Sequence, residues 1–296
     1  MSEFLQQLLN GLSLGAIYAL IALGYTMVYG VLRFINFAHA DVFMVGAFIG
    51  YYAGRHVPEG TLWGGLVVLA AAMAGCALLG MTIERLAYRP LRGAATLNVL
   101  ITAIGVSLLL EYSGQVFFGA TPRTFPAVFP SANFELGGLV ISSNQVVVIV
   151  VTTLLMVALE FIVHRTKIGT AMRAVSLNPR AAQLVGINND VVITFTFGLG
   201  SALAGAGGIL YALNYPSIDP LMGVMPGLKA FVAAVLGGIG NIPGAALGGL
   251  LLGIVETFVN GSQWSTYKDA IAFAVLILIL LFRPAGLLGR FTVEKV

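Results

Sequence analysis

The stretch HRTKIGTAMRAVSLNPRAAQLVGINND, residues 164–190, lies between two long apolar runs and carries the basic side chains Arg165, Lys167, Arg173 and Arg180. Charged side chains at this density cost too much free energy to lie inside a lipid bilayer. The stretch therefore predicts a basic loop outside the membrane, with an apolar segment entering the bilayer on each side of it.

A short helix is predicted inside this loop. Asn178 can accept hydrogen bonds from backbone N–H groups at the start of a helix, and Pro179 suits the first helical position because that N–H has no helical partner. Gly186 can take the left-handed conformation that ends many helices. These signals predict a helix of two turns over residues 179–185.

The apolar residues of this helix, Ala182, Leu184 and Val185, lie on or beside one side. An amphipathic helix outside the membrane buries its apolar side against another surface. We therefore expect a partner surface for this helix. An ordinary connecting loop is the alternative, and the residues by themselves leave both interpretations open.

The composition is that of an integral membrane protein. Hydrophobic residues make up 58% of the 296 residues and charged residues only 9%, and the mean hydropathy is +0.96. Soluble domains carry about 25% charged residues. Several apolar runs reach the about 20 residues that a helix needs to cross the bilayer, and none alternates as a barrel strand does. We predict an all-α polytopic membrane protein with one transmembrane domain over residues 1–296.

About eight membrane helices are predicted. The seventh apolar run is ~32 residues long and is interrupted by GGIGNIPG, residues 237–244, so it is expected to form a broken or re-entrant helical hairpin. Asn241 lies in this interruption and is a candidate for the translocation pathway. The runs cover approximately residues 8–32, 37–52, 62–83, 97–118, 139–163, 191–213, 228–259 and 270–282.

Basic residues gather in the loops on one side of the predicted membrane helices. Because basic loops stay on the cytoplasmic side, we expect the N-terminus outside and the C-terminus inside. The hairpin must then enter and leave on the outer side. The inner side would hold 11 of the 15 Lys and Arg residues, namely Arg33, Arg85, Arg89, Arg92, Arg165, Lys167, Arg173, Arg180, Arg283, Arg290 and Lys295.

Several other functions find no support in the sequence. The pI of about 9.1 is explained by membrane orientation, so no nucleic-acid partner is expected. The single Cys76 cannot form an intramolecular disulfide. The start MSEFLQQLLN lacks the positive charges of a signal peptide and is expected to be a retained first membrane helix.

Catalytic and nucleotide-binding motifs are also missing. The Gly-rich stretches GAGG and GGIGNIPG are not followed by the Lys-Ser/Thr of a nucleotide loop, so the chain is not expected to bind ATP by itself. Its three histidines, at positions 39, 56 and 164, have no metal-ligand spacing. We expect neither an enzyme nor a bound cofactor or metal. The glycine pairs Gly11 and Gly15, and Gly249 and Gly253, are expected to pack helices against each other.

Polar residues within or beside the apolar runs are candidates for the translocation pathway. Asn36, His39 and Asp41 cluster where the second run begins, and Glu111 and Glu256 lie deeper. Ionisable groups in membrane spans are expensive and mark a pathway or a pair by default. Stabilisation of the helix dipole by Asp41 is the alternative for the first cluster.

Three further charges are assigned structural or solvated positions. Glu160 lies close enough to the basic loop to pair with Arg165. Lys229 and Asp219, near a loop on the outer side, are expected to be solvated loop charges, with pairing to a docking partner as the alternative.

Four stretches together resemble a known family. They are LNGLSLGAIYALIALGYTMVYGVLRFINFAHADVFMVGAF at residues 9–48, RAVSLNPRAAQLVGIN at 173–188, VLGGIGNIPGAALGGLLLG at 235–253 and RPAGLLG at 283–289. As a set, they are similar to the branched-chain amino acid permease subunit of bacterial ABC importers. The resemblance covers nearly the whole chain.

The resemblance implies a division of labour in the inner membrane. A periplasmic substrate-binding protein would deliver the amino acid, this chain and a second homologous permease subunit would form the path, and two cytoplasmic ATP-binding subunits would drive transport. A short cytoplasmic helix would dock into a groove on the ATPase. The docking residues implied are Asn178, Pro179, Arg180, Ala182, Leu184 and Gly186.

Other functions remain open at this point. Relatives of the family carry urea, short amides or sugars, so the cargo is not fixed. A secondary transporter would couple to ions through Asp41, Glu111 or Glu256. A channel would conduct without any partner.

Overall fold

The computed structural model describes residues 2–289 and is mostly helical. Among these residues, seven helical segments are long and apolar enough to cross a membrane, which confirms the predicted fold class. These segments contain α1 (Ser2–Leu32), α3 (Leu62–Ile83), α4 (Thr96–Phe118), α5 (Ser143–Arg165), α8 (Asn189–Asn214), α10 (Ile242–Asn260) and α11 (Lys268–Phe282). The other helices are α2 (His39–Gly54), η1 (Glu84–Tyr88), η2 (Arg89–Leu91), α6 (Lys167–Leu177), α7 (Pro179–Leu184), α9 (Val224–Gly237) and η3 (Ser265–Tyr267).

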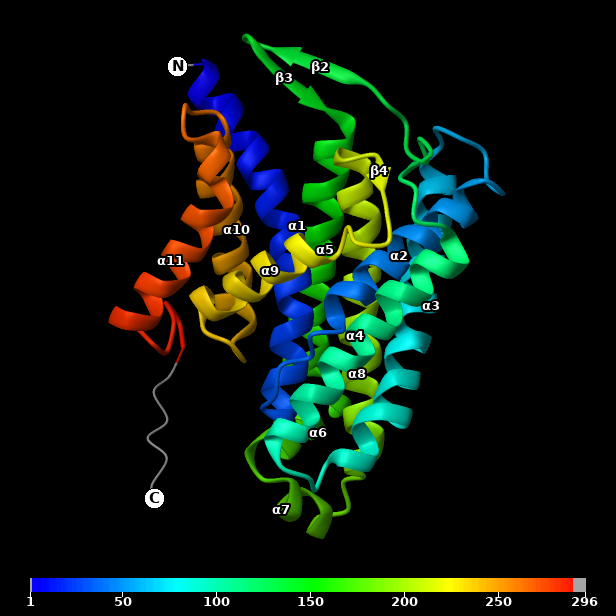
Figure 1. The fold of residues 1–296 in the computed structure, drawn as a ribbon, viewed down its shortest axis with the longest axis vertical. Helices are drawn as coiled ribbons and strands as arrows, with labels where there is room; N and C mark the ends of the chain where they lie inside the picture. The colour runs from blue at the N-terminus through cyan, green and yellow to red at the C-terminus, as the bar shows by residue number, and fades with distance from the viewer. Residues whose placement is uncertain (1, 290–296) are drawn as a thin grey trace.

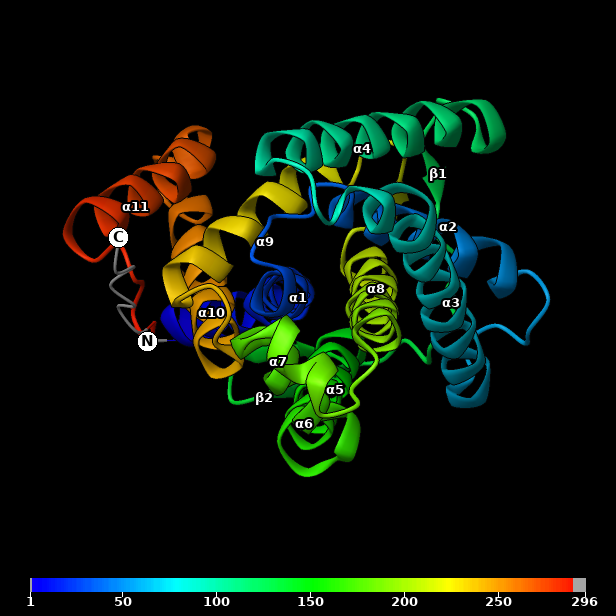
Figure 2. The same cartoon turned by 90° about the horizontal axis from the view of Figure 1, so that it is seen from below.

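α1 forms the centre of the bundle (Figures 1 and 2). It packs against α10, α8, α9 and α5, and 94% of its most apolar window is buried. The corresponding windows of α4 and α11, at the edge of the bundle, are only 17% and 6% buried. Because these edge helices are apolar on their exposed sides, they suit contact with lipid or another membrane subunit.

Glycine allows α1 and α10 to approach closely. A Cβ atom on Gly15 would lie 2.7 Å from Cα of Leu250, and one on Gly253 would lie 2.2 Å from Cα of Gly15. Gly11 and Gly249 meet the opposite helix in the same way. Small residues at four-residue spacing let helix backbones pack in a membrane, where the hydrophobic effect does not drive association. The predicted role of these glycine pairs is confirmed.

Two membrane helices, α2 and α9, are shorter than a full span and lie at mid-height of the bundle (Figure 1). α9 ends where Gly238 and Gly240 take positive φ angles of 105° and 91°. Asn241 then caps α10 by accepting a hydrogen bond from the N–H of Gly244 at 3.0 Å. The seventh apolar run is therefore broken into α9 and α10, as the sequence predicts.

The residues after α11 fold back onto the turn between α9 and α10. The backbone N–H groups of Leu287 and Leu288 donate to the carbonyl oxygens of Leu236 and Gly237 at 2.8 and 3.0 Å. The Asn241 side chain donates to the carbonyl oxygen of Leu288 at 2.8 Å. The RPAGLLG motif thus holds the tip of the hairpin in place.

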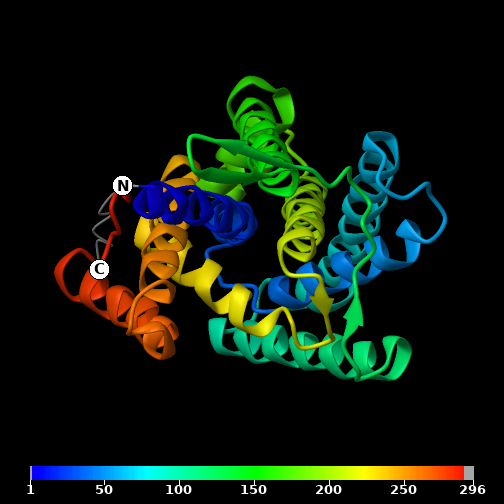
Figure 3. The same cartoon turned by 90° about the horizontal axis from the view of Figure 1, so that it is seen from above.

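Strands occur at one end of the bundle among residues 2–289 (Figures 1 and 3), which we call the strand end. An antiparallel hairpin there joins the start of α1, because Gln6 donates to the Val140 carbonyl at 2.9 Å and accepts from its N–H at 3.0 Å. α6 and α7 lie at the opposite end, the α7 end (Figure 1). The strands are β1 (Arg123–Thr124) paired with β4 (Ser217–Ile218), and β2 (Asn133–Leu136) paired with β3 (Leu139–Ser142).

The stretch 164–190 is more helical than a loop with one short helix, so that prediction is wrong for α6. Thr166 caps α6 by accepting from the N–H of Gly169 at 3.2 Å. Met172 and Val175, on one side of α6, are 2% and 1% exposed. Burial of this apolar side stabilises the helix although it also carries polar and basic side chains.

One detail of the charge assignment differs from expectation, and two residues of the basic tail are not tested. Glu160 pairs with His164 at 2.9 Å and not with Arg165, because a spacing of four residues places the two on one side of α5. Arg290 and Lys295, which contribute to the basic tail, lie outside the described residues.

Candidate functional site

α7 begins and ends with the capping groups that the sequence predicts. Asn178 Oδ1 accepts hydrogen bonds from the N–H groups of Arg180 and Ala181 at 3.0 and 3.1 Å. Pro179 occupies the first helical position, and Gly186 has a φ of +85° just beyond the helix. The helix ends one residue earlier than predicted.

α7 exposes apolar and basic side chains. Leu184 and Val185 are 89% and 77% exposed, and Arg180 is exposed beside them. Ala182 points inward and is only 3% exposed. The expectation that Ala182 contacts a partner is therefore wrong, because its side chain is already packed within the chain. Leu184 and Val185 thus form an exposed apolar surface beside Arg180, and such surfaces mark interaction sites.

Hydrogen bonds join α6 and α7 to the central helices. Ser176 Oγ, on α6, donates to the carbonyl oxygen of Gly30 near the end of α1. Asn189 Nδ2, at the start of α8, donates to the carbonyl oxygen of Pro179 at 2.9 Å. A displacement of α7 would thus act directly on α8 and, through α6, on α1.

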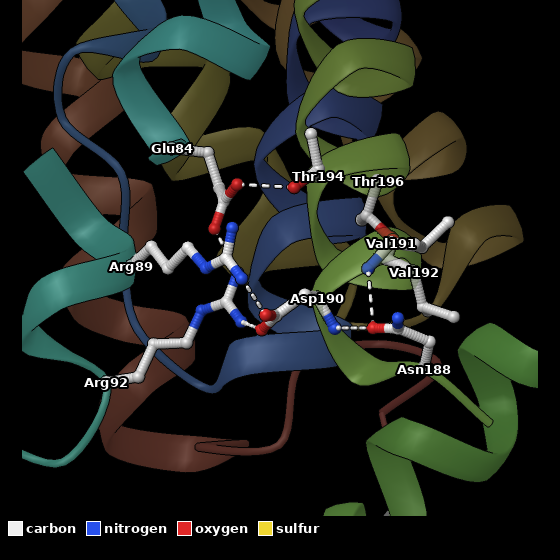
Figure 4. Close-up of polar contacts among 9 residues, drawn as sticks. All are labelled: Glu84, Arg89, Arg92, Asn188, Asp190, Val191, Val192, Thr194 and Thr196. Atoms are coloured by element: carbon white, nitrogen blue, oxygen red, sulfur yellow. Dashed lines mark hydrogen bonds and ion pairs between the residues drawn. The ribbon is translucent and has the colours of Figure 1, made fainter. Parts of the chain in front are cut away.

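A network of charged residues lies at the α7 end, between the α3–α4 connection and α8 (Figure 4). The carboxylate of Glu84, which is fully buried, accepts hydrogen bonds from Arg92 and, at 2.6 Å, from Thr194 Oγ1. Asp190 pairs with both Arg89 and Arg92. A buried carboxylate is stable only when it is paired in this way. The network therefore fixes the connection between α3 and α4 against the first turn of α8.

A cavity of about 640 Å³ lies between this network, the end of α1, α6 and α7. Its polar lining includes Arg33, Arg92 and Asp190. Arg33 ends α1 with a φ of +56°, a conformation uncommon for residues other than glycine. The cavity opens next to α7, so movement of α7 would change its shape.

The cluster Asn36, His39 and Asp41 is buried, with 3%, 1% and 1% exposure. Asn36 Oδ1 accepts a hydrogen bond from the Tyr88 hydroxyl at 2.6 Å. Asp41 Oδ2 accepts one from Ser107 Oγ, on α4, at 2.5 Å. These bonds connect the start of α2 to η1 and α4, so each of the two polar groups has a partner inside the bundle.

Glu111 lies on the same side of α4 as the partner of Asp41. It follows Ser107 by four residues, and such a spacing places two side chains on one side of a helix. His39 lies apart from these acids, with its ring 4.8 Å from the ring of Tyr25 between centroids. The structure thus brings Asp41 and Glu111 to neighbouring positions, while His39 packs among α1 residues.

Glu256 belongs to a buried ion cluster in the half of the bundle nearer the strand end. Lys229 Nζ, on α9, contacts Glu256 Oε1 at 2.5 Å and Asp269 Oδ1, on α11, at 2.6 Å. The Tyr18 hydroxyl, on α1, donates to Glu256 Oε2 at 2.9 Å. Lys229 is only 5% exposed. The expectation of a solvated charge is therefore wrong for Lys229, because α9 carries it into the bundle, whereas Asp219 stays in the loop.

Two polar cavities lead from the strand end toward this ion cluster. The outer one has a volume of about 550 Å³ and the deeper one about 250 Å³. Both are lined by Leu14, Tyr215, Glu256 and Lys268. The two cavities are therefore adjacent, and together they reach from the surface to the buried carboxylate of Glu256.

Comparison with known proteins assigns the chain to a family. Residues 7–280 match the family described as branched-chain amino acid transport system, permease component. The chain belongs to this permease family. Relatives include the high-affinity branched-chain amino acid transport system permease proteins BraD of Pseudomonas aeruginosa, 45% identical, and LivH of Escherichia coli K12, 43% identical. Each alignment covers 99% of this chain and 98% of the relative.

More distant similarity extends to sugar permeases. The ribose import permease protein RbsC of Escherichia coli K12 is 26% identical over 72% of this chain and 67% of its own length. The identity to BraD and LivH is much higher, so this permease is more similar to the amino-acid permeases than to the ribose permease.

The predicted pathway residues lie in three separate places in the permease. Asn36, His39 and Asp41 lie at or beside the start of α2, with Glu111 nearby on α4. Glu256 lies in the ion cluster, and Asn241 lies at the hairpin tip as a cap for α10. They do not form one continuous cluster. No group of three or more His, Cys, Asp or Glu side chains suited to a metal ion occurs within residues 2–289.

Sequence reasoning missed several residues of these sites. Tyr18 and Asp269 contact the ion cluster from helices far away in sequence, which no local pattern indicates. Glu84 could have been found from the sequence, because an acidic residue next to a basic cluster at the end of an apolar run indicates an ion pair. Asp190, at the start of α8, carried a similar signal.

Proposed function

We propose that this permease is the membrane subunit of an ATP-driven importer of branched-chain or other hydrophobic amino acids. High identity over nearly full length to the two amino-acid permeases supports the cargo class. The observation that carries the proposal of ATP-driven transport is α7, a capped helix with exposed Leu184 and Arg180 that is bonded to the central helices. ATP hydrolysis is then the work of separate subunits that dock on α7.

The proposed orientation places the α7 end in the cytoplasm and the strand end in the periplasm. The basic residues of the α3–α4 connection and of α5, α6 and α7 lie at the α7 end, as the positive-inside rule requires. α1 would begin outside and α11 would end on the inner side. The α9–α10 hairpin would enter the membrane from the outside and return there, which is tolerated because protein surrounds it.

The proposed mechanism runs from α7 to the central helices. ATP binding shifts α7, and the bonds from Ser176 to Gly30 and from Asn189 to Pro179 transmit the shift to α1 and α8. α1 carries α10 with it because their backbones are in contact. The path between this chain and a second, homologous permease subunit then alternates between outward-open and inward-open states. A periplasmic binding protein delivers the amino acid, and hydrolysis resets the cycle.

Gentle purification of the chain from its native membrane, followed by reconstitution of what comes with it, tests the proposal. We expect a second permease-like chain and ATP-binding subunits to accompany it. Leucine uptake into the resulting proteoliposomes should require ATP and the binding protein and persist after ionophores collapse the ion gradients. Recovery of the folded chain alone, or uptake that collapses with the ion gradient, would replace the proposal with an ion-coupled transporter.

A further inference from the structure

The two cavities at the strand end hold charges of both signs. The deeper cavity is lined by Glu256, Asp269, Lys229 and Lys268. Lys229 is committed to the ion cluster, with Glu256 at 2.5 Å and Asp269 at 2.6 Å. Charged side chains within a membrane subunit usually pair with one another or mark the path of a polar solute.

Two of these charged groups have capacity left for a ligand. Among residues 2–289, the side chain of Lys268 forms no hydrogen bond or ion pair, and it lines both cavities. Asp269 uses Oδ1 toward Lys229, which leaves Oδ2 free, and its side chain is 37% exposed. The two residues are consecutive in the first turn of α11. A cation and an anion thus stand side by side at the wall of one small cavity.

We propose that the deeper cavity binds the zwitterionic head of an α-amino acid, with the ligand carboxylate at Lys268 and the ligand ammonium at Asp269. This inference rests on the proposed function and names the site where the amino acid first contacts this subunit. The positive end of the α11 dipole adds to the attraction for the carboxylate. Leu14, Met225 and Pro226 supply an apolar wall for the ligand side chain.

The ion cluster gives Lys229 a positioning role at this site. Lys229 on α9 holds Asp269 on α11 and Glu256 on α10, so the three helices around the cavity meet at one ammonium group. Tyr18 fixes the other oxygen of Glu256 from α1 at 2.9 Å. The carboxylate of Asp269 is therefore held at the cavity wall before a ligand arrives, and a preorganised group binds more tightly than a mobile one.

The test measures equilibrium binding of tritiated leucine to the purified complete complex without its binding protein. Two competitors each lack one charge: leucinamide has the ammonium but no carboxylate, and 4-methylpentanoate has the carboxylate but no ammonium. We expect leucine to compete at least about tenfold better than either compound, because each loses a charge-assisted contact. Lys268→Gln should remove the preference for leucine over leucinamide, and Asp269→Asn the preference for leucine over 4-methylpentanoate.

Matched controls separate this effect from a general loss of charge. Arg55→Gln and Glu59→Gln remove a cation and an anion that line neither cavity, and both preferences should survive in them. Co-elution of each variant with its partner subunits reports assembly. If Asp269→Asn fails to assemble, Lys268→Gln decides the proposal, because Lys268 has no structural partner in the described part of the chain.

Two results would overturn the proposal. One is a wild-type complex that binds leucine no better than leucinamide and 4-methylpentanoate. The other is an assembled Lys268→Gln complex that keeps the full preference for leucine over leucinamide. Stimulation of ATP hydrolysis by leucine-loaded binding protein is measured in the same wild-type preparation. If stimulation is present while the charge preferences are absent, this site is wrong and the proposed function stands; if stimulation is absent, the proposed function itself is wrong.

Discussion

Single glycines determine how closely α1 and α10 approach. At Gly253 a side chain would meet backbone atoms of Gly15 at 2.2 Å, and backbone cannot move aside as a flexible side chain can. Gly105, on α4, has no heavy atom within 4 Å of its would-be Cβ. The two glycines share the helical conformation but differ in surroundings, so they form a matched pair for mutation.

Gly253→Val is expected to separate α1 from α10 and to lower the stability of the subunit, because overpacking costs about 1–3 kcal/mol or more. Gly105→Val should leave stability nearly unchanged. The test is the melting temperature of each purified variant in detergent. It is measured as the temperature at which half of the protein no longer elutes as a monodisperse peak after heating. Equal melting temperatures for the two variants would contradict the packing described for α1 and α10.

Lys229→Met leaves the carboxylates of Glu256 and Asp269 without their cation. Removing one partner of a buried ion pair costs about 3–5 kcal/mol, so the melting temperature should fall clearly below that of Lys167→Met, which removes an exposed lysine. Adding Glu256→Gln to Lys229→Met should recover part of the loss because one buried charge disappears. The same thermal assay decides, and a double variant less stable than the single one would refute the pairing.

Residue-level prediction from the sequence worked where a local rule was enough. The capping roles of Asn178, Pro179 and Gly186 were predicted correctly because capping depends on neighbours in sequence. Ala182 and Lys229 were assigned wrongly because their burial depends on which helix packs over them. Hydrophobicity and charge alone do not contain that information.

Among the elements, the α9–α10 hairpin depends on the chain segment after α11. Gly286, with a φ of +77°, brings that segment to the hairpin, and a Cβ there would lie 2.5 Å from the backbone nitrogen of Gly238. The segment then bonds to the last turn of α9. The hairpin tip is thus held by residues more than 40 positions away in sequence.

Gly286→Val should detach this segment from the hairpin tip, because it combines an unfavourable positive φ with a clash against backbone. We expect a lower melting temperature and reduced leucine uptake. Gly93→Val, at a glycine with open space around it, is the control and should behave like the wild type. Full stability and uptake for Gly286→Val would show that the contact is dispensable.

Element boundaries were predicted well where apolar runs end in polar or breaking residues. The third run coincides with α3, and the break near Asn241 separates α9 from α10. α6 was missed because its 11 residues carry basic side chains and only one narrow apolar side. Its stability comes from burial of Met172 and Val175 against the bundle, which becomes visible only in three dimensions.

The whole molecule has two chemically different ends, one basic with α7 and one with strands and polar cavities. This asymmetry predicts which residues each aqueous side can reach. Leu184 is exposed at the α7 end and Glu59 in the loop between α2 and α3. The native Cys76 is buried, so it gives little background in a labelling experiment.

A membrane-impermeant thiol reagent added to intact cells should label Glu59→Cys and leave Leu184→Cys unlabelled. After permeabilisation of cells that lack the ATP-binding subunits, which would otherwise cover Leu184, both should react. The expectation follows from the positive-inside rule, and mass-tag gel shifts of the purified chain measure it. Labelling of Leu184→Cys in intact cells would invert the proposed orientation.

The overall architecture was largely accessible from sequence because lipid forces every spanning segment to be apolar and helical. The lateral arrangement of the helices could not be predicted from the sequence. The meeting of Tyr18, Lys229, Glu256 and Asp269 requires four helices to pack in one particular order, and the spacing of residues along the chain does not encode that order.

We propose that α7 transmits the work of separate ATPase subunits to the membrane helices. The most direct test is leucine uptake and ATP hydrolysis by the complete complex in proteoliposomes carrying Arg180→Asp together with Leu184→Asp, compared with the charge-reversed control Arg85→Asp. We expect uptake to fall at least about tenfold, a loss of roughly 1.4 kcal/mol or more in coupling. We also expect that loaded binding protein no longer stimulates hydrolysis. Wild-type uptake by the double variant would contradict it.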